Sequence, residues 1–181
     1  MALNATIYKA EIHIADNDRG YYGSHAVTLA RHPSETDERM MIRLLAYALH
    51  ENGDGLLSFT RGLSETDEPD LWRRDLTGAI EQWVEVGLPD ARRLLKACGR
   101  AREVIVFAYG RNAAAWWATV SPKVARARGL KACILPAAGT QALSALAERT
   151  MTLHVNVQDC TAWVSGPTGE ASLEVTRLNP A

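Results

Sequence analysis

The sequence has no apolar stretch long enough to cross a membrane and few cysteines. Its longest apolar runs are residues 104–109 and 113–120, whereas a membrane-spanning helix needs about 18 or more apolar residues. The three cysteines, Cys98, Cys133 and Cys160, lie far apart and form no CxxC pair. We therefore expect reduced, buried thiols in a cytoplasmic protein that has no membrane partner. Charged residues near the start, where a signal peptide needs an apolar segment, agree with this.

Common catalytic motifs are absent as well. The five histidines form no HxH, HxxxH or HExxH pair, which argues against a zinc site. The sequence contains no GxSxG elbow, Walker loop or GxGxxG, and we expect no organic cofactor. Ser24 and His25 are neighbours on a predicted strand, so their side chains point to opposite faces and do not form a nucleophile–base pair.

The charges nearly cancel over the whole chain but not within each half. The 181 residues carry 20 basic and 21 acidic side chains, a formal net charge of −1. Residues 1–90 sum to −8 and residues 91–181 to +7, and between positions 92 and 131 ten basic residues face only Glu103. Such a zone is typical of nucleic-acid binding, although a solvated helix face has the same composition.

Length and patterning predict one mixed α/β domain over residues 1–181, with a central mixed sheet flanked by helices and antiparallel strands at both termini. No linker rich in proline or serine divides the chain. The expected strands are 6–14, 21–31, 56–62, 80–87, 104–109, 133–135, 153–157, 163–164 and 173–175. The expected helices are 34–50 with Ser34 as its cap, a short one at 69–74, 90–101, one carrying Trp116 and Trp117, one starting at Ser121, and 141–149.

The strand at 80–87 carries the most informative side chains. Alternation places Glu81, Trp83 and Glu85 on one face of an otherwise apolar strand. Carboxylates there need a divalent metal or an arginine partner, because an unpaired buried charge is costly. Four strand residues span about 13 Å, so Glu81 and Glu85 cannot hold one ion together. Each glutamate that binds a metal would need a second acid from elsewhere in the chain, and the candidates are Glu38, Asp70 and Asp75. In the alternative without a metal, the glutamates pair with nearby arginines such as Arg92 or Arg61.

Lys96 follows Glu85 on the next predicted helix. If that helix folds back over the sheet, the Lys96 ammonium approaches the carboxylates of the strand. Acids that hold a metal beside a lysine can polarise a phosphate and activate water. A solvated helix position is the alternative for Lys96.

Several segments together resemble the YaeQ family of small bacterial proteins. They are MALNATIYKA, LARHPSETDERMMIRLLAYAL, FTRGL, DEPDLW, WVEVGLPDARRLLKAC, the tryptophan pair at 116–117 and RTMTL. The resemblance implies a cytoplasmic bacterial protein with a restriction-endonuclease-like core, a compact variant of the PD-(D/E)XK nuclease fold. It brings no settled activity with it.

The superfamily pattern has an acid near one strand, acid-x-lysine on the next strand and often a glutamate on the preceding helix. The resemblance puts Glu85 at the acid of that second motif, and Gly87 stands where the lysine is expected. It further implies Lys96 as a migrated lysine and Glu38 as the helix glutamate. Glu81 is taken as the other acid, because Pro69-Asp70, which spells the opening letters of the motif, is interpreted as a helix start.

Two functions are consistent with these residues. In the first, a metal-dependent phosphodiesterase uses Glu81, Glu85 and Glu38 with Mg²⁺ or Mn²⁺ and Lys96 at the attacking water, while Arg92, Arg93 and Arg100 contact nucleic-acid phosphates. In the second, a non-catalytic module binds nucleic acid or protein on a degenerate nuclease fold, as Gly87 suggests. The sequence identifies no particular protein partner.

Overall fold

The protein is described by a computed structural model that covers residues 4–178 and has a mixed α+β fold. The elements are β1 (Thr6–Asp16), β2 (Tyr21–Arg31), α1 (Asp37–His50), β3 (Leu57–Phe59), a 3₁₀ turn (Gly62–Ser64), β4 (Leu71–Arg74), β5 (Ile80–Val86), α2 (Ala91–Cys98), β6 (Ala101–Ala108), α3 (Ala113–Val124), β7 (Leu130–Ile134), α4 (Ala137–Ser144), β8 (Thr150–Gln158), β9 (Thr161–Gly166), β10 (Gly169–Glu174) and β11 (Thr176–Leu178).

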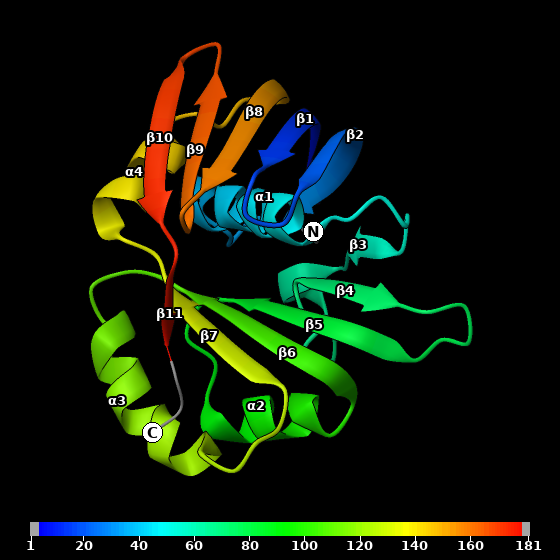
Figure 1. The fold of residues 1–181 in the computed structure, drawn as a ribbon, viewed down its shortest axis with the longest axis vertical. Coiled ribbons are helices and arrows are strands. Elements are labelled where there is room, and N and C mark those ends of the chain that lie inside the picture. The colour runs from blue at the N-terminus through cyan, green and yellow to red at the C-terminus, as the bar shows by residue number, and fades with distance from the viewer. Residues whose placement is uncertain (1–3, 179–181) are drawn as a thin grey trace.

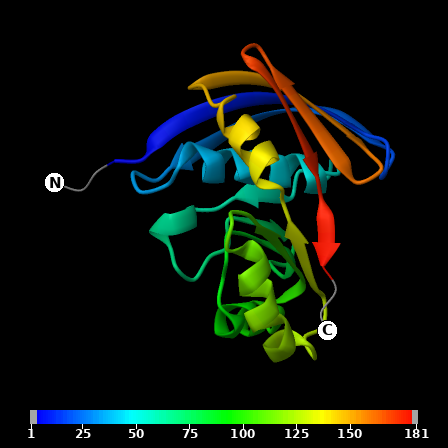
Figure 2. The same ribbon diagram turned by 90° about the vertical axis from the view of Figure 1, so that its left-hand side faces the viewer.

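Two β-sheets alternate with two layers of helices (Figures 1 and 2). The first sheet has the strand order β10-β9-β8-β1-β2, and the second has the order β11-β7-β6-β5-β4-β3. Helices α1 and α4 lie between the sheets, while α2 and α3 cover the outer face of the second sheet. The expectation of one central sheet is therefore wrong: the terminal strands form a sheet of their own rather than extending the central one.

The first sheet follows from strict alternation in its strands. Along β1 and β8 every second residue is buried, which gives one apolar face toward α1 and one polar face toward solvent. The predicted N-terminal hairpin is confirmed, since β1 pairs with β2 antiparallel over its full length. The predicted C-terminal strands are also confirmed as β8, β9 and β10; β8 in addition pairs with β1 in parallel.

The second sheet has a parallel centre made by β5, β6 and β7. Residues 104–108 of β6 are apolar and buried on both faces, as predicted for a central strand covered by helices on each side. Antiparallel strands extend both edges: β4 and β3 follow β5, and the short β11, which the sequence did not indicate, pairs with β7.

The predicted short helix at 69–74 is wrong, because residues Leu71–Arg74 form strand β4. Leu71 pairs with Val84 of β5, and Leu71 and Arg73 are buried while Arg74 is exposed. The local signal, a proline after several acids, favours a helix start. Pairing with the apolar β5 outweighs that preference, since it satisfies the backbone groups of both strands and buries Leu71.

The helices differ from prediction mainly at their ends. Thr36 rather than Ser34 caps α1, since its Oγ1 accepts a hydrogen bond from the backbone N–H of Arg39. Helix α2 ends at Cys98, before Gly99. Residue Pro122 does not begin a new helix but lies in the last turn of α3, and α4 begins four residues earlier than expected. Element ends depend on which groups cap them, and composition indicates these only loosely.

The apolar interior forms two clusters separated by the second sheet. The larger one lies between the sheets around α1, and the smaller one lies between the second sheet and helices α2 and α3. Alternation along β5 places Val84 in the first cluster and Trp83 in the second, as the sequence predicts. Within residues 4–178, no helix is long and apolar enough to cross a membrane.

Candidate functional site

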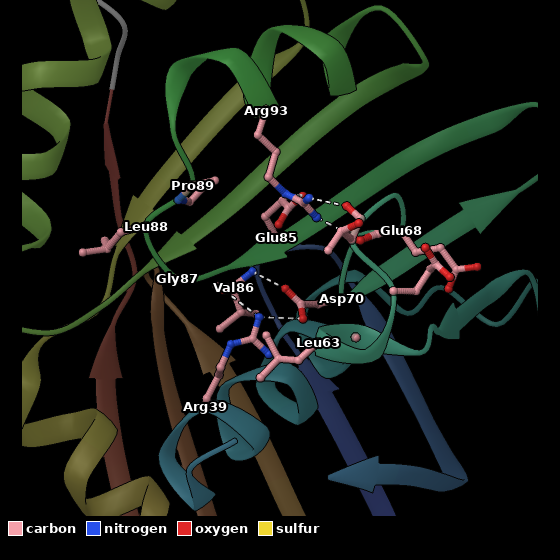
Figure 3. Close-up of a pocket in the computed structure, with 13 residues that line it drawn as sticks. Arg39, Leu63, Glu68, Asp70, Glu85, Val86, Gly87, Leu88, Pro89 and Arg93 are labelled. Carbon is pink, nitrogen blue, oxygen red and sulfur yellow. Dashed lines mark hydrogen bonds and ion pairs between the residues drawn. The ribbon is translucent and has the colours of Figure 1, made fainter. Parts of the chain in front are cut away.

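A cavity of about 340 Å³ lies at the end of β5, between α1, the start of α2 and the segment that leads into β4 (Figure 3). Its wall contains four carboxylates and two guanidinium groups, which is a formal charge of −2. These residues are Glu65, Glu68, Asp70, Glu85, Arg39 and Arg93. The cavity therefore combines residues from four elements that are distant in the sequence.

Asp70 stands immediately before β4 and is buried. Its backbone N–H donates to the carbonyl of Val84 at 2.9 Å, and its Oδ2 accepts from the backbone N–H of Val86 at 2.7 Å. Both bonds tie Asp70 to the neighbouring strand. The carboxylate is thus fixed beside the C-terminal end of β5, where Glu85 also lies.

Glu85 is the second buried carboxylate of the cavity. Its Oε1 accepts hydrogen bonds from Trp83 Nε1 at 2.8 Å and from Arg93 Nε at 2.7 Å, whereas its Oε2 accepts none from residues 4–178. Burial raises the pKa of Glu85; the contacts with Trp83 and Arg93 oppose this rise, and the charge of Asp70 adds to it. Burial, more than the charge of its neighbours, therefore disfavours the ionised form of Glu85.

Arg39 anchors the other side of the cavity from α1. It binds Glu35 Oε1 at 2.9 Å, Asp70 Oδ1 at 2.7 Å and the carbonyl of Val86 at 3.0 Å. Burial alone would lower the pKa of Arg39, but the charges and hydrogen bonds of Asp70 and Glu35 outweigh it and the pKa is raised. The guanidinium stays charged and holds Asp70 in place.

Arg93 and Lys96 of α2, and Arg100 just after it, bind the segment at 66–68. Arg93 donates to the carbonyls of Thr66 and Glu68 at 2.5 and 2.9 Å, and Lys96 Nζ lies 2.9 Å from Asp67 Oδ1. Arg100 donates to the carbonyl of Asp67 at 3.0 Å. These contacts fasten the segment to α2, and Thr66, Glu68 and Arg93 form one wall of the cavity (Figure 3).

The structure places the predicted residues in different surroundings. Of those named from sequence, Glu85 and Arg93 line the cavity. Glu38 accepts a hydrogen bond from Thr140 Oγ1 of α4 at 2.8 Å, and Glu81 lies 3.4 Å from the exposed Arg102. Among the described residues these two, with Lys96, Arg92 and Arg100, do not line the cavity, and Arg92 is exposed.

Asp70 is the acid that joins Glu85, and the sequence contained a signal for it. The residues around Pro69-Asp70 favour a helix start, yet Asp70 is among the possible second acids. Arg39 was missed: it precedes the apolar stripe of α1 and nothing in its spacing distinguishes it from a solvated arginine.

The cavity offers some, but not all, of the oxygen ligands that a hard divalent cation needs. Mg²⁺ and Mn²⁺ prefer oxygen ligands, and Mg²⁺ is commonly held by one or two carboxylates together with waters and substrate phosphates. Glu85 Oε2 accepts no hydrogen bond from residues 4–178 and is open for coordination. Within residues 4–178, no three histidine, cysteine, aspartate or glutamate side chains form a complete metal site, so substrate oxygens would have to complete the coordination.

Comparison with known proteins gives a consistent result. The family described as YaeQ protein matches residues 1–176. Two curated relatives, both named uncharacterized protein YaeQ, are from Salmonella typhi (46% identical) and Escherichia coli strain K12 (45%); each alignment spans 177 residues and covers 97% of both chains.

Two solved structures share the fold along the whole chain. The YaeQ protein of Xanthomonas axonopodis pv. citri has a TM-score of 0.92 and 46% identity, covering 98% of this chain and 99% of that one. The YaeQ protein of Pseudomonas syringae has a TM-score of 0.89 and 36% identity, covering 98% and 97%.

Proposed function

The chain belongs to the YaeQ family, and from the cavity beside β5 we propose that it is a divalent-metal-dependent phosphodiester hydrolase of the PD-(D/E)XK nuclease type. The observation that carries this proposal is that Asp70, just before β4, and Glu85, near the end of the adjacent antiparallel β5, line the same cavity. Pro69-Asp70 before β4 and Glu85-Val86-Gly87 at the end of β5 then take the places of the two halves of the motif.

Asp70 and Glu85 would hold Mg²⁺ or Mn²⁺, which when bound polarises a phosphate and lowers the pKa of a coordinated water. Arg39 and the backbone N–H of Val86 hold Asp70 in position. Trp83 Nε1 and Arg93 orient Glu85 so that its second oxygen is available. Glu81 and Glu38, named as ligands from the sequence, have no part in this version of the site.

Arg93 supplies the positive charge of the missing lysine, but it cannot act as a proton donor or acceptor as a lysine can. Gly87 has no side chain to offer, and Arg93 reaches the same carboxylate from the first turn of α2. A guanidinium does not lose its proton at physiological pH, so Arg93 can position and neutralise a phosphate but cannot relay a proton. Lys96, proposed from sequence for this role, instead contacts Asp67 at the surface.

The test measures Mn²⁺ binding calorimetrically and hydrolysis of bis(p-nitrophenyl) phosphate in the same samples. Wild-type protein should bind one ion per chain, and Glu85→Gln should weaken binding at least tenfold and abolish hydrolysis. Glutamine keeps the shape of Glu85 and can still accept from Trp83, so this variant should fold. Glu81→Gln, at the exposed end of the same strand, is the matched control and should behave as wild type.

A second candidate function is a non-catalytic module, and the Arg93–Glu85 ion pair favours it because an arginine neutralises the carboxylate without a metal. It predicts nucleic-acid binding that weakens with salt, needs no divalent ion and survives Glu85→Gln.

Equal Mn²⁺ binding by wild type and Glu85→Gln would overturn the hydrolase proposal. Crystals soaked in Mn²⁺ offer a second check, since an anomalous peak beside Asp70 and Glu85 is expected.

A further inference from the structure

A second and larger cavity, of about 500 Å³, lies between the two sheets and away from the acidic site. The end of α1, the inner faces of β6 and β7, the turns after β1 and β8, and β11 enclose it. Apolar side chains make up much of its wall, among them Leu49, Ile105, Phe107, Val157 and Val175. Its volume lies within the range of about 300–1,000 Å³ that is typical of small-molecule sites.

A hydrogen-bonded row of side chains crosses the second sheet along one side of this cavity. Arg73 Nε donates to Gln82 Oε1 at 3.0 Å, and Gln82 Nε2 donates to Glu103 Oε2 at 2.7 Å. Lys131 binds the other oxygen of Glu103. The row runs from β4 to β7, and its members hold one another in place, so the polar side of the cavity is preformed.

His50 contributes the polar group of its ring to the lining of the cavity. Its ring packs edge-on against Phe107, with the centroids 5.7 Å apart, and within residues 4–178 it makes no hydrogen bond. Burial lowers the pKa of His50 to about 4; Glu103 opposes this, while Arg19, Arg73 and Lys131 lower it further. The ring is therefore neutral at physiological pH and offers one donor and one acceptor to a ligand.

The lining of the cavity carries a formal charge of +1, which the pairing of Arg73 with Asp54 outside the lining offsets. Its lining includes three acids, Asp16, Asp18 and Glu103, and four cations, Arg19, Arg73, Lys131 and Arg177. Arg19 pairs with Asp16, Arg73 with Asp54 and Lys131 with Glu103. Among the described residues, Arg177 has no ion-pair partner, and it lies exposed on β11 where it can meet an incoming anion.

We propose that this second cavity binds a small organic anion with an apolar, flat body, whose anionic group contacts Arg177 and whose body packs on Phe107 beside His50. A buried apolar wall with a few fixed polar groups is the usual make-up of such a site. An arginine without a partner at the rim supplies a charge-assisted contact that a neutral ligand would forgo. This proposal does not rest on metal binding at Asp70 and Glu85.

The test uses 8-anilinonaphthalene-1-sulfonate, an aromatic anion, and follows its fluorescence on titration with wild-type protein. We expect saturable binding at one site per chain. Arg177→Glu should weaken binding about tenfold, the loss expected for a charge-assisted hydrogen bond. His50→Leu should also weaken it. N-phenyl-1-naphthylamine, which has the same body without the sulfonate, should bind about tenfold more weakly than the anion.

Arg111→Glu is the matched control, because Arg111 is exposed, follows β6 and does not line the cavity. It changes the net charge as Arg177→Glu does, and it should leave binding unchanged. Absence of saturable binding, or equal binding by wild type and Arg177→Glu, would overturn the proposal. Equal affinity for the neutral and anionic probes would overturn its anionic part. Because Arg177 is exposed, its variant should fold even where His50→Leu does not.

Discussion

Glu35 is a buried carboxylate that links two arginines of α1, Arg39 and Arg43. Its Oε1 accepts from Arg39 and Arg43, and its Oε2 accepts from Arg43 at 2.7 Å. Arg43 is 1% exposed and Glu35 4%, so neither charge has water to solvate it. The pair connects the hairpin end at Ala30 through α1 to the acidic cavity.

Glu35→Gln should lower the free energy of unfolding by about 3–5 kcal/mol, because it leaves the buried Arg43 without its counter-charge. Urea denaturation measures this. Glu81→Gln, whose pair with Arg102 is exposed, should change stability by less than about 0.5 kcal/mol. Equal losses of unfolding free energy in Glu35→Gln and Glu81→Gln would show that the burial of Arg43 does not determine the cost of removing its counter-charge.

The second prediction at this scale concerns His50. Its pKa is about 4 in the folded protein and 6.5 in a solvated histidine, so the unfolded chain takes up a proton that the folded chain does not. The contribution of neutral His50 to the free energy of unfolding is fully present above the unfolded-state pKa of 6.5. It is lost as pH falls from 6.5 toward 4, by at most about 3 kcal/mol. Unfolding midpoints of wild type and His50→Gln from pH 7 to pH 4 should show the slope reduced in the variant.

At the scale of elements, helix α1 shows how one hydroxyl sets a boundary. Ser34 and Thr36 are both plausible caps in HPSETDE, and Ser34 instead forms an exposed contact with His32. Thr36 has an extended backbone and its Oγ1 accepts from Arg39 N–H. Since Arg39 also binds Asp70, the start of α1 helps to define the acidic cavity.

Thr36→Ala should therefore cost about 1 kcal/mol, the usual cost of losing a cap. Ser34→Ala should leave the unfolding midpoint close to that of wild type, since its contact is exposed. Thermal unfolding of the two variants side by side measures the difference. A larger loss of stability for Ser34→Ala than for Thr36→Ala would show that Ser34, the cap expected from the sequence, caps α1.

At the scale of the whole molecule, the second sheet is the shared wall of both apolar clusters. Val84, Ile105 and Phe107 face the first cluster from the same strands whose Trp83 and Val104 face the second. Neither cluster can lose the sheet and keep its packing. We therefore expect the two clusters to unfold together, as the predicted single domain over residues 1–181 implies.

Urea unfolding followed by two probes tests this expectation. Four of the five tryptophans, Trp72, Trp83, Trp116 and Trp117, lie in the second sheet or in α3, whereas far-UV circular dichroism reports on both sheets. The two curves should coincide with one midpoint. Leu94→Ala in the smaller cluster and Leu153→Ala in the larger should both shift that midpoint, each by about 2–5 kcal/mol in free energy. Separate transitions would mean two independent units.

Sequence alone determined most of the strands and helices, because alternation and helical spacing reflect burial that each segment carries in its own residues. The hairpin, β5, β6 and the C-terminal strands follow from such local patterns. It also singled out Glu85 as a carboxylate in need of a partner. Tertiary structure decided the partners: Asp70 rather than Glu81 joins Glu85, and Arg93 rather than Lys96 reaches it.

The physical reason is that these choices depend on pairing between distant segments. Residues 71–74 become a strand only because β5 lies beside them, and this pairing brings Asp70 to the backbone of Val86. The separation of the terminal strands into a sheet of their own likewise depends on β1 meeting β8 across more than a hundred residues. Local preference cannot specify either contact, since the free energy that selects it is gained only when both partners are in place.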